Sequence, residues 1–265
     1  MMLYSIFKKI YFRIRFIFIF LNKKNFLPLG LFPIILRRDI INFSFFIQNR
    51  YLENSSNGYW ELKPKLTSKE LNEYYSTIYY KHHRKKIEKN ITPRDLDQFM
   101  IIKNKILDLE NRKLKILNFG SGYSGLSYLF MLNGHEVINV DPACENNDNF
   151  GIKYIKSLDQ FNDKTDFFFS SHSLEHVENL DSLLYNVSNI LNNNGYLFIE
   201  VPNCGLDNKN GGFNGKIIPP HTYYFRKEFF KNLNYNLVDL NIYSQIKFPH
   251  PIHDEGEIIR YIGKK

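Results

Sequence analysis

Cysteine is scarce in this chain: the 265 residues include only two, Cys144 and Cys204. Two cysteines do not make the disulfide framework of a small secreted domain, and these two do not form a metal-binding C-x-x-C pattern. A chain without structural disulfides is typical of a reducing compartment. We therefore expect a cytoplasmic protein.

Long hydrophobic runs are also lacking. The apolar stretches near the amino end are Phe16–Leu21, Phe26–Leu36, which contains two prolines, and Ile40–Ile47. None of them approaches the roughly 18 uncharged residues that a membrane-spanning helix needs. No small-residue cleavage site follows the first stretch, so a cleaved signal peptide is not expected.

Most of the chain has no net positive charge. The excess of basic residues is concentrated at one end. Residues 1–50 hold nine of the 35 basic residues and one of the 27 acidic residues, which leaves 26 of each sign in the remainder. A neutral folded domain argues against nucleic-acid binding, which needs a basic face. The sequence therefore divides into a basic apolar segment, residues 1–50, and a domain, residues 51–265.

Two interpretations of residues 1–50 stay open. Neighbouring basic and aromatic side chains suit a membrane interface, where rings lie at headgroup depth and cations meet anionic lipid. That interpretation predicts peripheral contact with the inner face of the membrane. The alternative is a pair of helices packed on the domain, with their cations in solvent.

A glycine motif organises the domain. Gly120, Gly122 and Gly125 form G-x-G-x-x-G between an apolar strand, 114–119, and an amphipathic helix, 126–132. A second strand, 136–140, leads to Asp141, which lies 21 positions after the first glycine. Glycines let the backbone approach a ligand, the helix start offers free N–H groups, and the acid is spaced to bind ribose hydroxyls. The pattern therefore predicts a site for an adenosine-containing cofactor.

Strand and helix patterns alternate along the rest of the domain. Further strands are expected at 152–155, 166–170, 196–201, 236–242 and 257–262. Helices are expected from Thr67 toward His82, from Thr92 to about Glu110, at 181–191 and at 226–233. This alternation predicts an α/β fold with a doubly wound, mostly parallel, seven-stranded sheet of Rossmann-like type, preceded by an N-terminal helical extension.

The sequence resembles the class I S-adenosylmethionine-dependent methyltransferases. The likeness rests on Ile116–Gly122 with Asp141, Ser170–Val177, Gly195–Asn203 and Pro220–Phe225. The second and third stretches resemble the branch that contains ubiquinone-type and bacterial glycan methyltransferases. The resemblance implies S-adenosylmethionine as the cofactor and an O-methylated sugar or other small acceptor, lipid-linked or free, in surface polysaccharide biosynthesis.

The resemblance also implies cofactor-binding positions. The residues implied to bind the methionine end of the cofactor are Asn118, Gly120, Ser121, Gly122 and Tyr123. Asp141 is implied to bind the ribose, and Ser157 and Leu158 to face the adenine. Ser171 and His172 are implied to close the pocket. Asn118 departs from the family, which usually has an acid there that can help to hold the ammonium group. An amide offers only a neutral oxygen, so cofactor affinity is the property that this departure affects.

His176 and His221 are the candidate catalytic residues, because histidine is the usual general base for a hydroxyl acceptor near neutral pH. Each is equally compatible with a structural role. His172, Glu175 and His176 also have the H-x-x-E-H spacing that brings three metal ligands together on a helical turn. A cofactor-lining histidine and an acid at a helix start explain that spacing more simply, so no metal is expected.

Two other functions fit the glycine motif. One is a nicotinamide-dinucleotide oxidoreductase, which would bring a pyrophosphate to the glycine loop. The other is a methyltransferase fold that binds a ligand without catalysis, which Asn118 keeps open. The expected partners are a small-molecule or glycan acceptor and no nucleic acid.

Overall fold

The computed structural model describes residues 50–75, 91–106, 108–122, 124–142, 152–204, 220–244 and 257–265. Residues 1–49, which make up almost all of the basic segment and of the predicted helical extension, lie outside this part of the chain. Tyr123 and residues 76–82, the last part of the helix predicted from Thr67 toward His82, also lie outside it. No helix within the described ranges is long and apolar enough to cross a membrane.

A seven-stranded sheet forms the centre of the domain, in the order β5-β4-β3-β6-β7-β10-β9. The strands are β3 (Lys115–Phe119), β4 (Glu136–Val140), β5 (Lys153–Ile155), β6 (Thr165–Ser171), β7 (Leu191–Pro202), β9 (Asn236–Ser244) and β10 (Glu257–Lys264). The first five strands in that order are parallel, and β10 is antiparallel to both β7 and β9. The expected doubly wound, mostly parallel α/β fold is confirmed.

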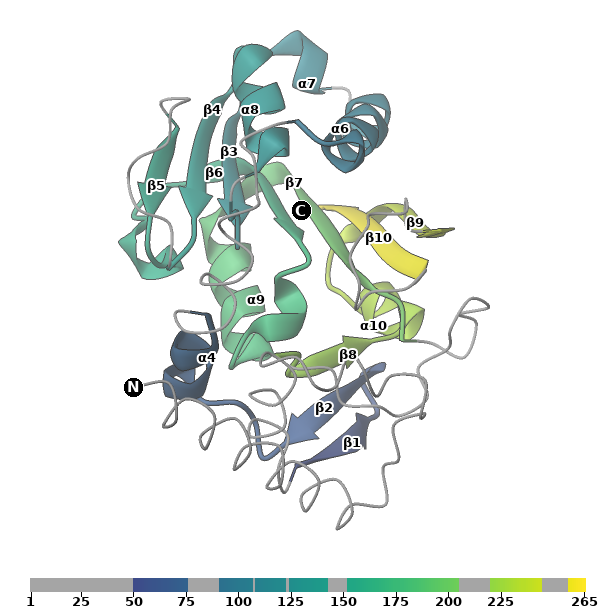
Figure 1. The fold of residues 1–265 in the computed structure, drawn as a ribbon. Helices are drawn as coiled ribbons and strands as arrows, with labels where there is room; N and C mark the ends of the chain where they lie inside the picture. The colour runs from purple at the N-terminus through teal and green to yellow at the C-terminus, as the bar shows by residue number, and fades with distance from the viewer. Residues whose placement is uncertain are drawn as a thin grey trace, which may run out of the picture.

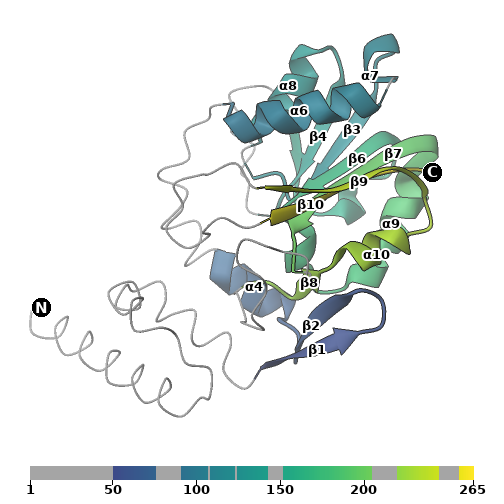
Figure 2. The ribbon, with the colours of Figure 1, turned by 90° about the vertical axis from the view of Figure 1, so that its right-hand side faces the viewer.

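Helices cover both faces of this sheet, as Figures 1 and 2 show. The helices on one face are α6 (Pro93–Lys105), α7 (Asp108–Asn111) and α8 (Gly125–Leu132); those on the other are α9 (Leu180–Ile190) and α10 (Lys227–Lys231). Alternate strand residues enter the two layers: Phe167 and Phe169 pack with α6 and α8, whereas Phe168 packs with α9. Because both faces are covered, β6 is apolar without interruption.

Two expected boundaries are wrong. The helix that begins at Thr92 ends at Lys105 rather than near Glu110, because Ile106 is extended at φ −114° and ψ 92° and separates α6 from α7. Strand β7 begins at Leu191 rather than Tyr196, and its pairing with β6 shifts register between Thr165 and Phe167. The two expected helix starts are confirmed: Thr67 and Thr92 each form a capping box.

A small second sheet is absent from the sequence predictions. It is antiparallel, in the order β1-β2-β8, and is built from β1 (Tyr51–Ser55), β2 (Tyr59–Lys63) and β8 (Tyr223–Phe225). With α4 (Ser68–Tyr74) the small sheet lies beyond the ends of the strands of the main sheet (Figure 1). Two backbone hydrogen bonds, from Thr222 N–H to the Glu175 oxygen and from Cys204 N–H to the Phe225 oxygen, show that these are the carboxyl ends of β6 and β7.

We expect Gly58→Ala to destabilise the protein more than Gly134→Ala. Both glycines have a left-handed backbone, with φ of 88° and 86°. At Gly58 a Cβ would lie 2.9 Å from the Glu228 carbonyl carbon and the Phe229 Cα, whereas at Gly134 no described atom lies within 4 Å. Backbone strain alone costs on the order of 1 kcal/mol, and a clash with backbone adds about 1–3 kcal/mol. Urea unfolding of both variants measures the difference; equal losses would contradict the close packing of the small sheet on α10.

Candidate functional site

The glycine loop bends sharply at the carboxyl end of β3. Gly120 and Gly122 have φ of 68° and 49°, the left-handed region that glycine adopts readily. The N–H groups of Gly120 and Ser121 both donate to the Val140 oxygen, at 2.8 and 3.2 Å. A Cβ on Gly122 would have no atom of the described residues within 4 Å.

Asp141 lies directly against this loop. Its Oδ2 accepts a hydrogen bond from the Gly122 N–H at 2.7 Å, and its own N–H donates to the Ile155 oxygen at 3.0 Å. The carboxylate is therefore fixed between the ends of β3 and β4, as the 21-residue spacing predicts. Leu158, also predicted to line the cofactor, begins a short 3-10 helix (Leu158–Gln160) just after β5.

Asn118 has a buried structural environment. Its side-chain amide donates to Ser127 Oγ at 2.8 Å, and that hydroxyl donates to Asn139 Oδ1 at 2.7 Å. Asn118 is 2% exposed. The amide thereby joins β3, α8 and β4 beneath the glycine loop, and contact between Asn118 and a cofactor stays a prediction.

A carboxylate occupies the N-terminus of α8, the helix that follows the glycine loop. Asp95 Oδ1 accepts a hydrogen bond from the Leu126 N–H at 3.1 Å, while Asp95 Oδ2 accepts from the Thr92 N–H at 2.8 Å. Asp95 therefore stabilises the starts of both α6 and α8. Ser124 Oγ accepts from the Ser127 N–H at 3.2 Å and occupies a second donor of α8.

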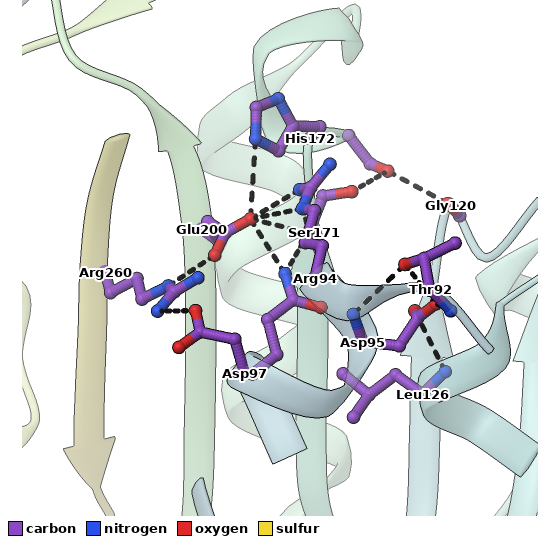
Figure 3. Close-up of polar contacts among 12 residues, drawn as sticks. Thr92, Arg94, Asp95, Asp97, Gly120, Leu126, Ser171, His172, Glu200 and Arg260 are labelled. Carbon is purple, nitrogen blue, oxygen red and sulfur yellow. Dashed lines mark hydrogen bonds and ion pairs between the residues drawn. The ribbon is translucent and has the colours of Figure 1, made fainter. Parts of the chain in front are cut away.

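Glu200, on β7, is the centre of a buried ionic cluster (Figure 3). Its side chain is fully buried and pairs with Arg94 from α6 and, at 2.5 Å, with Arg260 from β10. Gln98 Nε2 also donates to Glu200 Oε1 at 2.7 Å. Burial alone would raise the pKa of Glu200, but Arg94, His172 and Arg260 outweigh it and hold that pKa well below its ordinary value of 4.5.

Ser171 and His172 connect this cluster to the end of β6. Arg94 donates to Ser171 Oγ at 2.6 Å, and His172 Nε2 lies 3.4 Å from Glu200 Oε1. His172 has φ of 50°, a conformation unusual for a residue with a side chain. Burial and then the Arg94 charge lower the pKa of His172.

The two predicted catalytic histidines lie together. His176 ends a 3-10 turn (Leu174–His176) after β6, and His221 comes from the segment before β8. Their ring centroids are 4.8 Å apart, and Tyr75 at the end of α4 packs edge-on against His176 at 6.1 Å. Residues far apart in the sequence thus meet where the small sheet approaches the main one.

Glu175 lies with these histidines in the interior. It is 1% exposed, and neither carboxylate oxygen has a hydrogen-bond partner among the described residues. Burial raises the pKa of Glu175 to about 8. One ligand atom from each of Glu175, His176 and His221 lies within 4.8 Å of the others.

The structure therefore forms two groups from the predicted residues. Gly120, Ser121, Gly122 and Asp141 form the glycine-loop group, and His176 and His221 form the histidine group; Ser171 and His172 lie on β6 or directly after it. The sequence predictions missed Arg94, Asp95 and Gln98. All three lie in the first turns of α6. Arg94 and Gln98 bind Glu200, which follows about 100 residues later, and Asp95 binds the start of α8, so no local sequence pattern indicates these contacts.

Comparisons with known proteins agree with this geometry. A family model described as "Methyltransferase domain" matches residues 84–244, more than half of the chain. No curated protein sequence matches significantly.

A solved structure shows a similar fold at low sequence identity. The 1,6-didemethyltoxoflavin N1-methyltransferase of Burkholderia thailandensis, solved with its acceptor and S-adenosylhomocysteine, superposes with a TM-score of 0.55 at 13% identity, over 82% of this chain and 96% of that one. The magnesium protoporphyrin IX methyltransferase of Synechocystis, solved with S-adenosylhomocysteine, gives a TM-score of 0.49 at 12% identity, over 74% of this chain and 100% of that one. With the family match and the confirmed fold, the chain belongs to the methyltransferase-domain family and has the class I S-adenosylmethionine-dependent methyltransferase architecture.

Proposed function

We propose that the chain transfers a methyl group from S-adenosylmethionine to a hydroxyl of a small acceptor. The observation that carries the proposal is the left-handed glycine loop with the Asp141 carboxylate bound to the Gly122 N–H. An acid at the end of the second strand is placed to accept hydrogen bonds from ribose hydroxyls. Similar structures with S-adenosylhomocysteine bound support the same cofactor.

In this proposal the cofactor lies along the carboxyl edge of the main sheet. Gly120, Ser121, Gly122 and Tyr123 line its methionine end, Leu158 lies toward the adenine, and Ser171 and His172 close the pocket. Asn118 supports the loop from below through Ser127, since its amide nitrogen is already committed there.

The environment of α8 argues against the dinucleotide alternative. A pyrophosphate binds at the helix that follows a glycine loop because that helix offers free N–H groups and a positive dipole end. Here Asp95 and Ser124 already accept from the Leu126 and Ser127 N–H groups. A fixed carboxylate at this position repels an anionic pyrophosphate, whereas S-adenosylmethionine has none.

The chemistry requires little beyond alignment and proton removal. S-adenosylmethionine supplies a methyl group that is already activated. The acceptor oxygen forms a bond to that carbon while the carbon–sulfur bond breaks, and the hydroxyl proton passes to an imidazole. His176 and His221 are the proposed bases, because both lie at the same sheet edge as the glycine loop and are shielded by Tyr75 and Tyr224.

The acceptor that we propose is a sugar or other small molecule, lipid-linked or free, used in surface-glycan synthesis. Its support is the sequence resemblance at 170–177 and 195–203 to glycan methyltransferases. Incubation of the purified chain with isotopically labelled S-adenosylmethionine and extracted glycan or lipid-linked sugar tests it. Label in a base-stable sugar ether is the expected product; binding of NAD without S-adenosylmethionine binding would contradict methyl transfer, and cofactor binding without any transfer would support the non-catalytic alternative.

Residues 1–50 are proposed to contact the membrane interface, because they combine the excess cations of the chain with many aromatic residues. We expect a form lacking residues 1–50 to move from the membrane to the soluble fraction of cells. Cell fractionation with immunodetection measures this, and high salt should partly mimic the deletion because lipid attraction is screened. Identical fractionation of both forms would support packing on the domain instead.

A further inference from the structure

The histidine group has an unpaired carboxyl group, that of Glu175, at its centre. Both oxygens of Glu175 are buried without a hydrogen-bond donor among the described residues, although the side chain is almost completely enclosed. A buried carboxylate that lacks donors is costly unless a cation compensates it. Two histidine nitrogens lie close to Glu175 Oε1: His176 Nε2 and His172 Nδ1 are each 3.7 Å away, too far for a hydrogen bond.

The separation between Glu175 and His176 is close to that between two ligands of one metal ion. Two ligands that bind zinc tetrahedrally at about 2.0–2.1 Å lie about 3.4 Å apart. The 3.7 Å separation differs from this by a few tenths of an ångström. The ligand atoms of Glu175, His176 and His221 lie within 4.8 Å of one another, so side-chain rotation must shorten the longest of these separations by up to about 1.4 Å for all three to bind one ion.

Backbone contacts hold the three residues in place. The Thr222 N–H donates to the Glu175 oxygen at 2.7 Å, so His221 is fixed beside the turn that carries Glu175 and His176. His176 also packs against His221 and Tyr75. The histidine group is thus built from the turn after β6 and the segment just before β8, rather than from one helical turn.

We propose that Glu175, His176 and His221 bind a divalent transition metal of the zinc class. Two imidazoles and one carboxylate are the protein ligands of many catalytic zinc sites, which leave a further position open. Imidazole ligands disfavour magnesium and calcium, which prefer oxygen. This ligand set differs from the H-x-x-E-H spacing, because His221 rather than His172 has a ligand atom near both Glu175 and His176. His172 lies between two carboxylates, with Nδ1 3.7 Å from Glu175 and Nε2 3.4 Å from Glu200.

Metal binding has a consequence for the reaction, and this consequence alone rests on the proposed function. A histidine nitrogen that binds the metal is no longer available as a base. A zinc-class ion instead lowers the pKa of a bound hydroxyl or water. His176 and His221 would then act on the acceptor as metal ligands.

Zinc titration of the chelator-treated full chain tests the proposal. We expect one zinc per chain by calorimetry and elemental analysis, and a higher melting temperature with zinc. Glu175→Gln and His221→Ala should each weaken zinc binding at least 100-fold, whereas His172→Ala should retain the wild-type stoichiometry. Cobalt should give the visible absorption of a tetrahedral site, lost in His221→Ala.

Titration with S-adenosylhomocysteine separates this proposal from the proposed function. Wild-type affinity for that ligand in Glu175→Gln and His221→Ala shows that both variants are folded. Absence of zinc binding by the wild type, or unchanged zinc binding in His221→Ala, would overturn the metal site while leaving cofactor binding intact. Zinc binding without any S-adenosylhomocysteine binding would uphold the site and refute the proposed function.

Discussion

Glu200→Gln should lower the free energy of unfolding by about 3–5 kcal/mol, the usual cost of removing one partner from a buried ion pair. The substitution keeps the shape of the side chain but leaves Arg94 and Arg260 beside a neutral amide. Glu200 is fully buried, and its two arginines come from α6 and β10. Loss of the Glu200 carboxylate should therefore weaken the attachment of α6 to the sheet. Urea unfolding followed by circular dichroism measures it.

Asp97→Asn is the matched control for this experiment. Asp97 pairs with the same arginine, Arg260, at 2.7 Å, but its side chain is 37% exposed. Exposed ion pairs contribute about 0–1 kcal/mol, so this variant should remain close to wild type. Equal effects of the two substitutions would contradict the central position of Glu200 in the cluster.

The same cluster predicts a pH dependence. The pKa of Glu200 is lower in the folded than in the unfolded chain, so its ionisation stabilises the fold above the unfolded value of about 4.5. That contribution is lost as the pH falls through the folded pKa. The difference in stability between wild type and Glu200→Gln should accordingly be full at pH 7 and shrink below about pH 4.5. A difference independent of pH would mean that shape, not charge, causes it.

Asp141→Ala should weaken binding of S-adenosylmethionine about 10- to 100-fold without unfolding the protein. Hydrogen bonds to a charged group contribute about 1.5–3 kcal/mol, which corresponds to that range of affinity. The substitution also removes the acceptor of the Gly122 N–H. Calorimetric titration with S-adenosylhomocysteine measures the affinity, and the melting temperature reports the fold.

Asp141→Asn distinguishes the two effects. The amide oxygen can still accept from the Gly122 N–H, so the loop should keep its position, but the charge that holds the ribose is gone. We expect an affinity between those of wild type and Asp141→Ala. Wild-type affinity in Asp141→Ala would contradict the assignment of the ribose to this residue.

Much of the main sheet could be predicted from the sequence because its signals are local. Strand β4 was predicted with its observed bounds, and the capping residues Thr67 and Thr92 marked two helix starts. Continuous apolar runs such as Phe167–Phe169 indicate strands covered on both faces. Where the prediction failed, at Ile106 and before Tyr196, the boundary depends on packing between elements.

The small sheet could not be predicted because its pairing is distant. Strand β2 pairs with β8 more than 160 residues later, through Tyr59 with Phe225 and Glu61 with Tyr223. Its strands have only three to five residues, and the turn before Gly58 looks like any loop. This distant pairing and the Thr222–Glu175 backbone hydrogen bond bring His221 to His176.

Individual residues of the candidate site could be predicted from the sequence, but their spatial arrangement could not. Glycine spacing identifies the loop and Asp141, because a strand, a turn and a helix dictate their geometry. Local spacing suggested that His172 would share a face with Glu175 and His176. In the structure His172 lies beside Glu175 as well as Glu200, with Nδ1 3.7 Å from Glu175 and Nε2 3.4 Å from Glu200, while His221 completes the histidine group.

A crystal structure of the full chain with S-adenosylhomocysteine tests the account most directly. We predict that both ribose hydroxyls donate to the Asp141 carboxylate and that the amino-acid end of the ligand lies along Gly120–Gly122. A ligand bound elsewhere, or a glycine loop that stays empty at saturating ligand, would contradict it.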